Sequence, residues 1–133
     1  LSQTLGNRVD NTLLLIEDDP FMQDLLSLYL TEAGWQTDVV EDGKRAWAIL
    51  QTNPKRYQMI LLDRDLPGIS GLDLLSLIKQ PPLLKQIPVI LETAEDSYEA
   101  VIEGLQAGAD YYLAKPIDST QLLDLIQMAM SND

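Results

Sequence analysis

The segment Met59-Ile60-Leu61-Leu62-Asp63-Arg64-Asp65-Leu66-Pro67-Gly68 contains the pattern that organises this chain. Its first four residues are apolar, which is typical of a short strand in a parallel sheet, because such a strand is buried on both faces. The acids, proline and glycine that follow are typical of a turn. Asp63 therefore closes a predicted buried strand and opens a turn.

Three other apolar runs end in polar residues in the same way. These runs and the polar residues that follow them are Leu13–Ile16 with Glu17 and Asp18, Val89–Leu91 with Thr93, and Tyr111–Leu113 with Lys115. A fifth predicted strand, Trp35–Val40, alternates less cleanly. All four polar clusters therefore stand at the carboxyl ends of predicted strands.

Amphipathic segments separate the strands. In one of them, Tyr98, Val101, Ile102 and Leu105 recur at the spacing of one helical face. The predicted helices are one that begins at Pro20 and is ended by Gly34, and others over Gly43–Thr52, Gly71–Gln80 (broken by Pro81-Pro82), Ser97–Ala107 and Ser119–Met130 (capped by Asp118). Five strands alternating with five helices predict an α/β fold, a doubly wound parallel sheet covered on both faces.

The domain is expected over residues 12–131, with a flexible lead-in over 1–11. In open sheets of this kind the functional site lies at the carboxyl ends of the strands. We therefore expect the four polar clusters to form one site.

Composition excludes several classes of protein. The chain has 133 residues, enough for one domain, and it contains no cysteine and no histidine, so disulfides, thiol nucleophiles, Ser-His triads and histidine zinc sites are excluded. The net charge of −12 argues against direct nucleic-acid binding and favours basic protein surfaces or divalent cations as partners. No apolar run is long enough for a membrane span and no signal peptide is apparent, so a cytoplasmic location without a membrane partner is expected.

The clustered acids predict a metal site. Carboxylates that converge repel one another unless a cation neutralises them, and Mg²⁺ needs only one or two carboxylates besides water and phosphate. Asp18 and Asp63 are the expected direct ligands, with Glu17 further away. An aspartate can accept a phosphoryl group, so Asp63 is the expected nucleophile. Lys115 would supply a positive charge, and Thr93 a hydroxyl donor.

Each residue also has an ordinary structural explanation when taken alone. Glu17-Asp18-Asp19 could be a solvated strand exit, and Asp19 is assigned as the cap of the helix that begins at Pro20. Thr93 favours strands, and Lys115 could be a surface lysine. Their joint occurrence at strand ends argues against coincidence.

Over Thr12–Met130 the chain resembles the receiver domain of bacterial two-component response regulators. The stretches that carry the resemblance are Leu14-Leu15-Ile16-Glu17-Asp18-Asp19, Leu62-Asp63-Arg64-Asp65-Leu66-Pro67-Gly68-Ile69-Ser70-Gly71, Thr93-Ala94 and Gly108-Ala109-Asp110-Tyr111-Tyr112-Leu113-Ala114-Lys115-Pro116. The resemblance implies a flavodoxin-like sheet of strand order 2-1-3-4-5. It also implies transfer of a phosphoryl group to Asp63 from a histidine kinase or a histidine phosphotransfer protein.

The resemblance further implies residue roles. Glu17 and Asp18 would bind Mg²⁺ with Asp63, and the backbone carbonyl of Asp65 would complete the protein ligands. The resemblance also implies that the domain is not an enzyme in the ordinary sense, because such a domain catalyses only its own phosphorylation and dephosphorylation.

The switch residues follow from the same resemblance. Thr93 and Tyr112 would form the pair that responds to phosphorylation. Lys115 would form an ion pair with the phosphoryl group, and its bond to Pro116 would be cis.

Three departures from the family pattern stand out. Glu92, just before the switch threonine, replaces a small or apolar residue and would raise the cost of bringing in a phosphoryl group. Asp65 and Glu95 occupy positions that flank the attacking water and tune hydrolysis. The segment from Ser97 onward has six acids and a single base, so a dimer held by arginine ion pairs is not expected.

Two other functions are compatible with parts of this sequence pattern. A receiver-like binding module that works without phosphorylation is kept open by Glu92. A haloacid-dehalogenase-like phosphatase would also use an aspartate nucleophile, but its metal-binding acids follow the lysine, whereas here they precede Asp63. The output is left open: the chain is either a stand-alone receiver or part of a longer protein.

Overall fold

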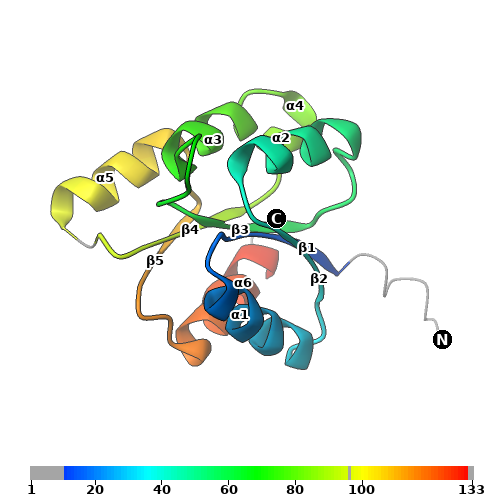
Figure 1. Ribbon diagram of the computed structural model, residues 1–133, viewed down its shortest axis with the longest axis vertical. Coiled ribbons are helices and arrows are strands. Elements are labelled where there is room, and N and C mark those ends of the chain that lie inside the picture. Colours follow the sequence, from blue (N-terminus) through cyan, green and yellow to red (C-terminus); the bar gives the residue numbers. More distant parts are fainter. Residues whose placement is uncertain (1–10, 96, 132–133) are drawn as a thin grey trace.

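Strands and helices alternate along the chain (Figure 1). The computed structural model describes residues 11–95 and 97–131, so the predicted lead-in lies outside them except for its last residue. The strands are β1 (Thr12–Ile16), β2 (Gln36–Val40), β3 (Met59–Asp63), β4 (Val89–Thr93) and β5 (Tyr111–Ala114). The helices are α1 (Pro20–Glu32), α2 (Gly43–Thr52), α3 (Gly71–Ile78), α4 (Pro82–Lys85), α5 (Tyr98–Ala107) and α6 (Ser119–Ser131).

The strands form one parallel sheet in the order β2-β1-β3-β4-β5, which confirms the predicted topology. Helices α2, α3, α4 and α5 cover one face, and α1 and α6 cover the other (Figure 1). The fold is therefore the doubly wound, flavodoxin-like α/β architecture. Because the order places β1 beside β3 and β3 beside β4, the ends of these three strands are neighbours at the carboxyl edge.

Side chains of the central strands alternate between two cores. Leu14, Ile60 and Leu91 belong to the core under α2, α3 and α4, whereas Leu15 and Leu61 belong to the core under α1 and α6. Every residue of β1, β3 and β4 is buried, which explains their solid apolar runs. The edge strand β2 is half exposed, which explains its less regular pattern.

The predicted number of helices was wrong by one. Helix α3 ends at Ile78, before the pair Pro81-Pro82 that was expected to break it, and the pair begins the short helix α4. Proline is tolerated in the first turn, where its missing N–H would have no helical partner, and the Lys85 N–H donates to the Pro81 carbonyl at 2.8 Å.

Element boundaries differ from the prediction by one or two residues. β3 and β4 extend to include Asp63 and Thr93 as their last residues, β2 begins at Gln36, and α3 ends at Ile78. Within the described ranges, no helix combines the length and apolar character that crossing a membrane requires.

Candidate functional site

The carboxyl edge of the sheet brings Glu17, Asp18 and Asp63 together, as predicted. One carboxylate oxygen of each lies within 4.8 Å of the other two. Asp63 ends β3, and Glu17 directly follows β1, whose Ile16 pairs in register with Leu62. Asp18 is exposed, whereas Glu17 and Asp63 are 0% and 2% exposed. Carboxylates this close require a cation or a proton for stability.

Asp19 does not have the predicted capping role. It stands at the N-cap position of α1, but its side chain makes no capping hydrogen bond. Its backbone N–H instead donates to Glu17 Oε2 at 3.1 Å, and Gln23 Nε2 donates to the Glu17 carbonyl at 2.7 Å. The start of α1 therefore holds Glu17 in place.

Asp63 is held by Lys115 and by its own turn. Lys115 Nζ lies 3.2 Å from Asp63 Oδ1, and the Asp65 N–H donates to the same oxygen at 2.9 Å. Burial raises the pKa of Asp63, and the Glu17 carboxylate adds to the increase, while the Asp65 N–H and Lys115 oppose it. Burial lowers the pKa of Lys115, but the Asp63 carboxylate and the neighbouring Glu17 and Glu92 together outweigh it, so the net pKa is raised. Both ionic partners are thus favoured in their charged forms by one another.

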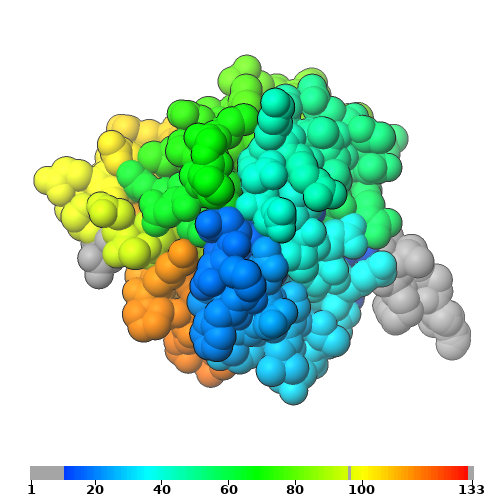
Figure 2. Space-filling view, viewed as in Figure 1, coloured from blue at the N-terminus to red at the C-terminus, as the bar shows by residue number. Residues whose placement is uncertain are grey.

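The loop after β5 delivers Lys115 to this edge. In the space-filling view, the start of α1 (blue) lies beside the segment that follows β5 (orange) (Figure 2). The bond between Lys115 and Pro116 is cis, which confirms the prediction. The Lys115 backbone N–H also donates to the Thr93 carbonyl at 2.8 Å.

Thr93 and Tyr112 are connected through one peptide segment. The Glu95 N–H donates to Thr93 Oγ1 at 2.9 Å, and the Tyr112 hydroxyl donates to the Glu95 carbonyl. Thr93 is fully buried, and the Tyr112 ring packs against the core under α3. Any movement of the Thr93 hydroxyl therefore acts on the segment that also holds Tyr112.

Asp65 and Glu95 present exposed side chains at the mouth of the site. Their backbone groups form the hydrogen bonds of the site. The Asp65 N–H donates to Asp63, the Glu95 N–H donates to Thr93, and the Glu95 carbonyl accepts from Tyr112. Their proposed effects on hydrolysis, and the Asp65 carbonyl as a metal ligand, stay predictions.

Glu92 lies beneath the site as a fully buried acid. It pairs in register with Asp63 on β3 and with Leu113 on β5, and its side chain is 0% exposed. Apart from a proton that Glu92 and Glu17 could share, no donor of the described residues reaches either carboxylate oxygen of Glu92 or the buried Glu17 Oε1. Burial, and then the neighbouring Glu17 carboxylate, raise the pKa of Glu92 to about 10. Glu92 is therefore uncharged near neutral pH in the metal-free chain.

Two residues of the site were missed in the sequence. Gly71 packs against the backbone after the strand: an added Cβ would lie 2.3 Å from the Asp63 carbonyl oxygen and 2.6 Å from Arg64 Cα. Arg64 does not point to solvent but reaches α5. A glycine three residues after Pro-Gly was visible in the sequence, whereas the path of the Arg64 side chain was not.

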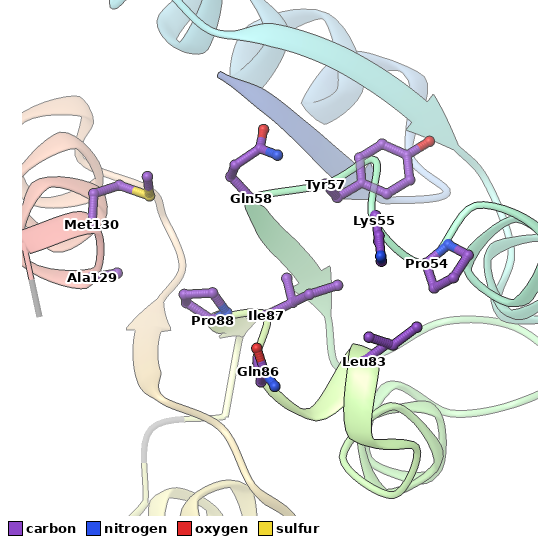
Figure 3. A pocket seen from close by; sticks show the side chains of 10 residues that line it. All are labelled: Pro54, Lys55, Tyr57, Gln58, Leu83, Gln86, Ile87, Pro88, Ala129 and Met130. Carbon is purple, nitrogen blue, oxygen red and sulfur yellow. The ribbon is translucent and has the colours of Figure 1, made fainter. Parts of the chain in front are cut away.

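A hollow of about 440 Å³ lies elsewhere, at the amino-terminal ends of the strands (Figure 3). Its described lining residues are Pro54, Lys55, Tyr57, Gln58, Leu83, Gln86, Ile87, Pro88, Ala129 and Met130. None of these is a predicted site residue, so the hollow is separate from the acidic cluster.

Comparison with known proteins agrees with this geometry. A sequence model described as the response regulator receiver domain matches residues 13–127. The chain belongs to the response regulator receiver domain family. This membership favours the receiver reading over a haloacid-dehalogenase-like phosphatase.

Several individual proteins are similar to this receiver domain in sequence or in structure. It is 36% identical over 86% of its length to the Two-component response regulator-like APRR5 of Arabidopsis thaliana, of which it covers 20%. A response regulator structure from Chloroflexus aurantiacus J-10-fl matches 92% of the receiver domain and 98% of its own chain with 32% identity and a TM-score of 0.86. The receiver domain of sensor histidine kinase PA1611 from Pseudomonas aeruginosa PAO1 matches 92% and 98% with 29% identity and a TM-score of 0.81.

The PA1611 receiver domain structure has a magnesium ion coordinated in its active-site cleft. This receiver domain spans 17% of the length of the protein RcaC of Microchaete diplosiphon and 51% of that of the phosphate regulon regulator PhoB of Klebsiella pneumoniae. Larger relatives therefore carry further segments beyond the matched region.

Proposed function

We propose that Asp63 is the phosphoacceptor of this receiver domain. The observation that carries the proposal is the convergence of Asp63 with Glu17, Asp18 and Lys115 at the carboxyl edge of the sheet. Asp63 Oδ1 already accepts bonds from Lys115 and from the Asp65 N–H, which leaves Oδ2 to attack phosphorus. The O–P bond forms as the bond between phosphorus and the donor breaks, and the leaving group keeps that electron pair.

Mg²⁺ fits the residues that would hold it. Glu17 Oε1 is a buried carboxylate oxygen without a hydrogen-bond partner, and it belongs to the cluster that includes Asp18 and Asp63. Hard divalent cations are bound by such oxygens, and the ion would neutralise charge on the phosphoryl group. Lys115 supplies the second positive charge.

The donor would be a histidine kinase or a histidine phosphotransfer protein, as family membership suggests. The net charge of −12 makes a basic or apolar protein surface a better output partner than nucleic acid or an anionic membrane. Thr93 would bind a phosphoryl oxygen and pass the change through Glu95 to Tyr112.

The test is incubation with a small acyl-phosphate donor and Mg²⁺, followed by intact-protein mass spectrometry. We expect one added phosphoryl group in the wild type and none in Asp63→Asn. Asp65→Asn is the matched control, because Asp65 is a nearby exposed acid, and it should still be labelled. Full labelling of Asp63→Asn would refute the assignment of the acceptor.

A second function is favoured by one observation. The Glu92 carboxyl group is buried against the site, and no positively charged group of the described residues pairs with it. A receiver that works as a binding module without phosphorylation would tolerate this arrangement. Absence of labelling in the wild type under these conditions would favour that function.

A further inference from the structure

Arg64, the residue after the proposed phosphoacceptor, connects its loop to α5. Arg64 Nη1 donates to the Ala100 carbonyl at 3.1 Å, and Nη2 donates to Glu103 Oε1 at 2.6 Å. The Arg64 side chain is only 14% exposed, whereas that of Glu103 is 59% exposed. The guanidinium group is thus enclosed between the loop and the first turns of the helix.

The same part of α5 lies against the switch tyrosine, because Gly104 directly follows Glu103. Burial lowers the pKa of Arg64, but Glu103 and then Tyr112 raise it more. Gly104 of α5 makes room for the ring, because an added Cβ would lie 3.0 Å from Tyr112 Cε2. Arg64, Tyr112 and α5 therefore meet at one junction.

Only an arginine can make this set of contacts. Its planar fork addresses two acceptors at once, here a backbone carbonyl and a carboxylate, whereas a lysine offers one point charge. The hydrogen bond to the Ala100 carbonyl does not depend on the position of the exposed Glu103 side chain. The contact therefore ties the loop to the helix backbone rather than to a mobile side chain alone.

We propose that Arg64 is a positioning residue that couples the loop carrying Asp63 to helix α5 and, through that helix, to the Tyr112 ring that packs on it. The proposal rests on the proposed function, because the signal it transmits is phosphorylation of Asp63. It adds a second route from the site toward Tyr112, besides the one through Thr93 and Glu95. The two acceptors of Arg64 are 36 and 39 residues further along the chain.

The experiment is amide hydrogen exchange of α5, with and without Mg²⁺ and beryllofluoride as a phosphoryl mimic. Without the mimic, Arg64→Met should exchange about five- to tenfold faster than the wild type at residues 100–104, because charge-assisted bonds to the helix are lost. With the mimic bound, the further change in α5 should be smaller in Arg64→Met than in the wild type. Arg64→Lys should restore part of both effects.

Matched variants separate coupling from general loosening. Glu103→Gln removes the ion pair but leaves the bond to the Ala100 carbonyl, so its effect should be smaller. Arg45→Met removes an exposed arginine of α2 and should change nothing in α5. If Arg64→Met proves unstable, Arg64→Lys combined with Glu103→Gln provides the same comparison.

Each contrary result has a distinct meaning. Exchange in α5 within twofold of the wild type, or an equal acceleration across all elements, would overturn the coupling. Failure of Arg64→Met to bind beryllofluoride would overturn it as well, because Arg64 would then serve phosphoryl binding directly. If the wild type itself does not bind the mimic, the proposed function fails, and faster exchange confined to α5 in the resting state still decides whether Arg64 holds the helix.

Discussion

Apart from the neighbouring Glu17, no side chain or backbone group of the described residues offers a hydrogen bond to the Glu92 carboxyl group, although its side chain is fully buried. A buried carboxyl group in this position avoids the cost of desolvating a charge by keeping its proton. Glu17 faces the opposite demand, because it must be ionised to help bind a cation. The two neighbouring acids therefore differ in the charge that their roles require.

Glu92→Gln should flatten the dependence of stability on pH. The folded pKa of about 10 lies above the ordinary value of 4.5, so the stabilising contribution is complete below pH 4.5 and is lost as the pH rises toward 10. In that window the wild type should lose up to about 1.4 kcal/mol of unfolding free energy per pH unit through this proton. The raised pKa of Asp63 acts in the same direction and persists in the variant.

This effect is measured by urea unfolding at several pH values with a chelator present, so that no metal binds the acids. The variant should be more stable than the wild type at neutral and higher pH. Glu41→Gln, at an exposed acid, serves as the control and should follow the wild-type curve. Parallel curves for the wild type and Glu92→Gln would show that Glu92 carries no raised pKa.

Asp18→Ala should weaken Mg²⁺ binding by about tenfold or more, because few-ligand Mg²⁺ sites depend on each carboxylate. Isothermal titration calorimetry gives the affinity directly. Asp19→Ala is the matched neighbour: its backbone N–H still binds Glu17, and its side chain makes no capping bond, so affinity should be retained. Unchanged binding by Asp18→Ala would place the cation elsewhere.

At the scale of single elements, α3 begins against the backbone of the phosphoacceptor loop. The Gly71 N–H donates to the Arg64 carbonyl at 2.9 Å, and Ser70 caps the helix by accepting from the Asp73 N–H. This close approach holds the loop against the start of the helix. It requires a residue without a side chain at the first position of the helix.

Gly71→Ala should destabilise the domain by about 2 kcal/mol or more, because the new methyl group would overlap the Asp63 carbonyl and force the backbone to shift. The same shift should reduce phosphorylation of Asp63. Gly43→Ala is a milder control, since its nearest neighbours lie at 3.3 Å. Thermal unfolding and labelling with an acyl phosphate measure the two effects, and equal behaviour of both variants would contradict the argument.

At the scale of the whole molecule, two sets of hydrogen bonds connect the acidic edge to the surface at the β5 end of the sheet, which α5, β5 and α6 form. One runs from Thr93 through Glu95 to Tyr112, and the other from Arg64 to α5. A phosphoryl group adds about −1.5 to −2 charge, which is enough to shift a two-state side-chain arrangement. We therefore expect the response to appear on this face.

Amide chemical shifts with and without a phosphoryl mimic should change over α5, β5 and α6 as well as around Asp63, with smaller changes in α2. Helix α2 is the internal control because it packs on the same face of the sheet without a bond to Thr93, Tyr112 or Arg64 among the described residues. Changes confined to the loop after β3 would refute the proposed route. The surrounding acidity implies that the responding partner presents a basic or apolar surface.

Local patterns in the chain were sufficient for the fold class, the order of the elements and most of the site. Runs such as Leu13–Ile16 and Met59–Leu62 identify buried parallel strands because burial on both faces demands apolar residues at every position. The acids, the hydroxyl and the lysine at strand ends then predict one site, since parallel strands end at the same edge. Helix α4 was not predicted, because two prolines indicate the end of one helix as readily as the start of the next.

Tertiary structure alone decided what these residues contact. Glu17 and Glu92 are 75 positions apart, and they come together only because β3 alone separates β1 from β4 in the sheet. The Arg64 side chain binds α5, and Asp19 binds Glu17 through its backbone N–H rather than through its side chain. Neither contact follows from the sequence, because side-chain direction depends on the elements packed around a residue. Periodicity records burial along one element, whereas the pairing of polar groups depends on how separate elements pack together.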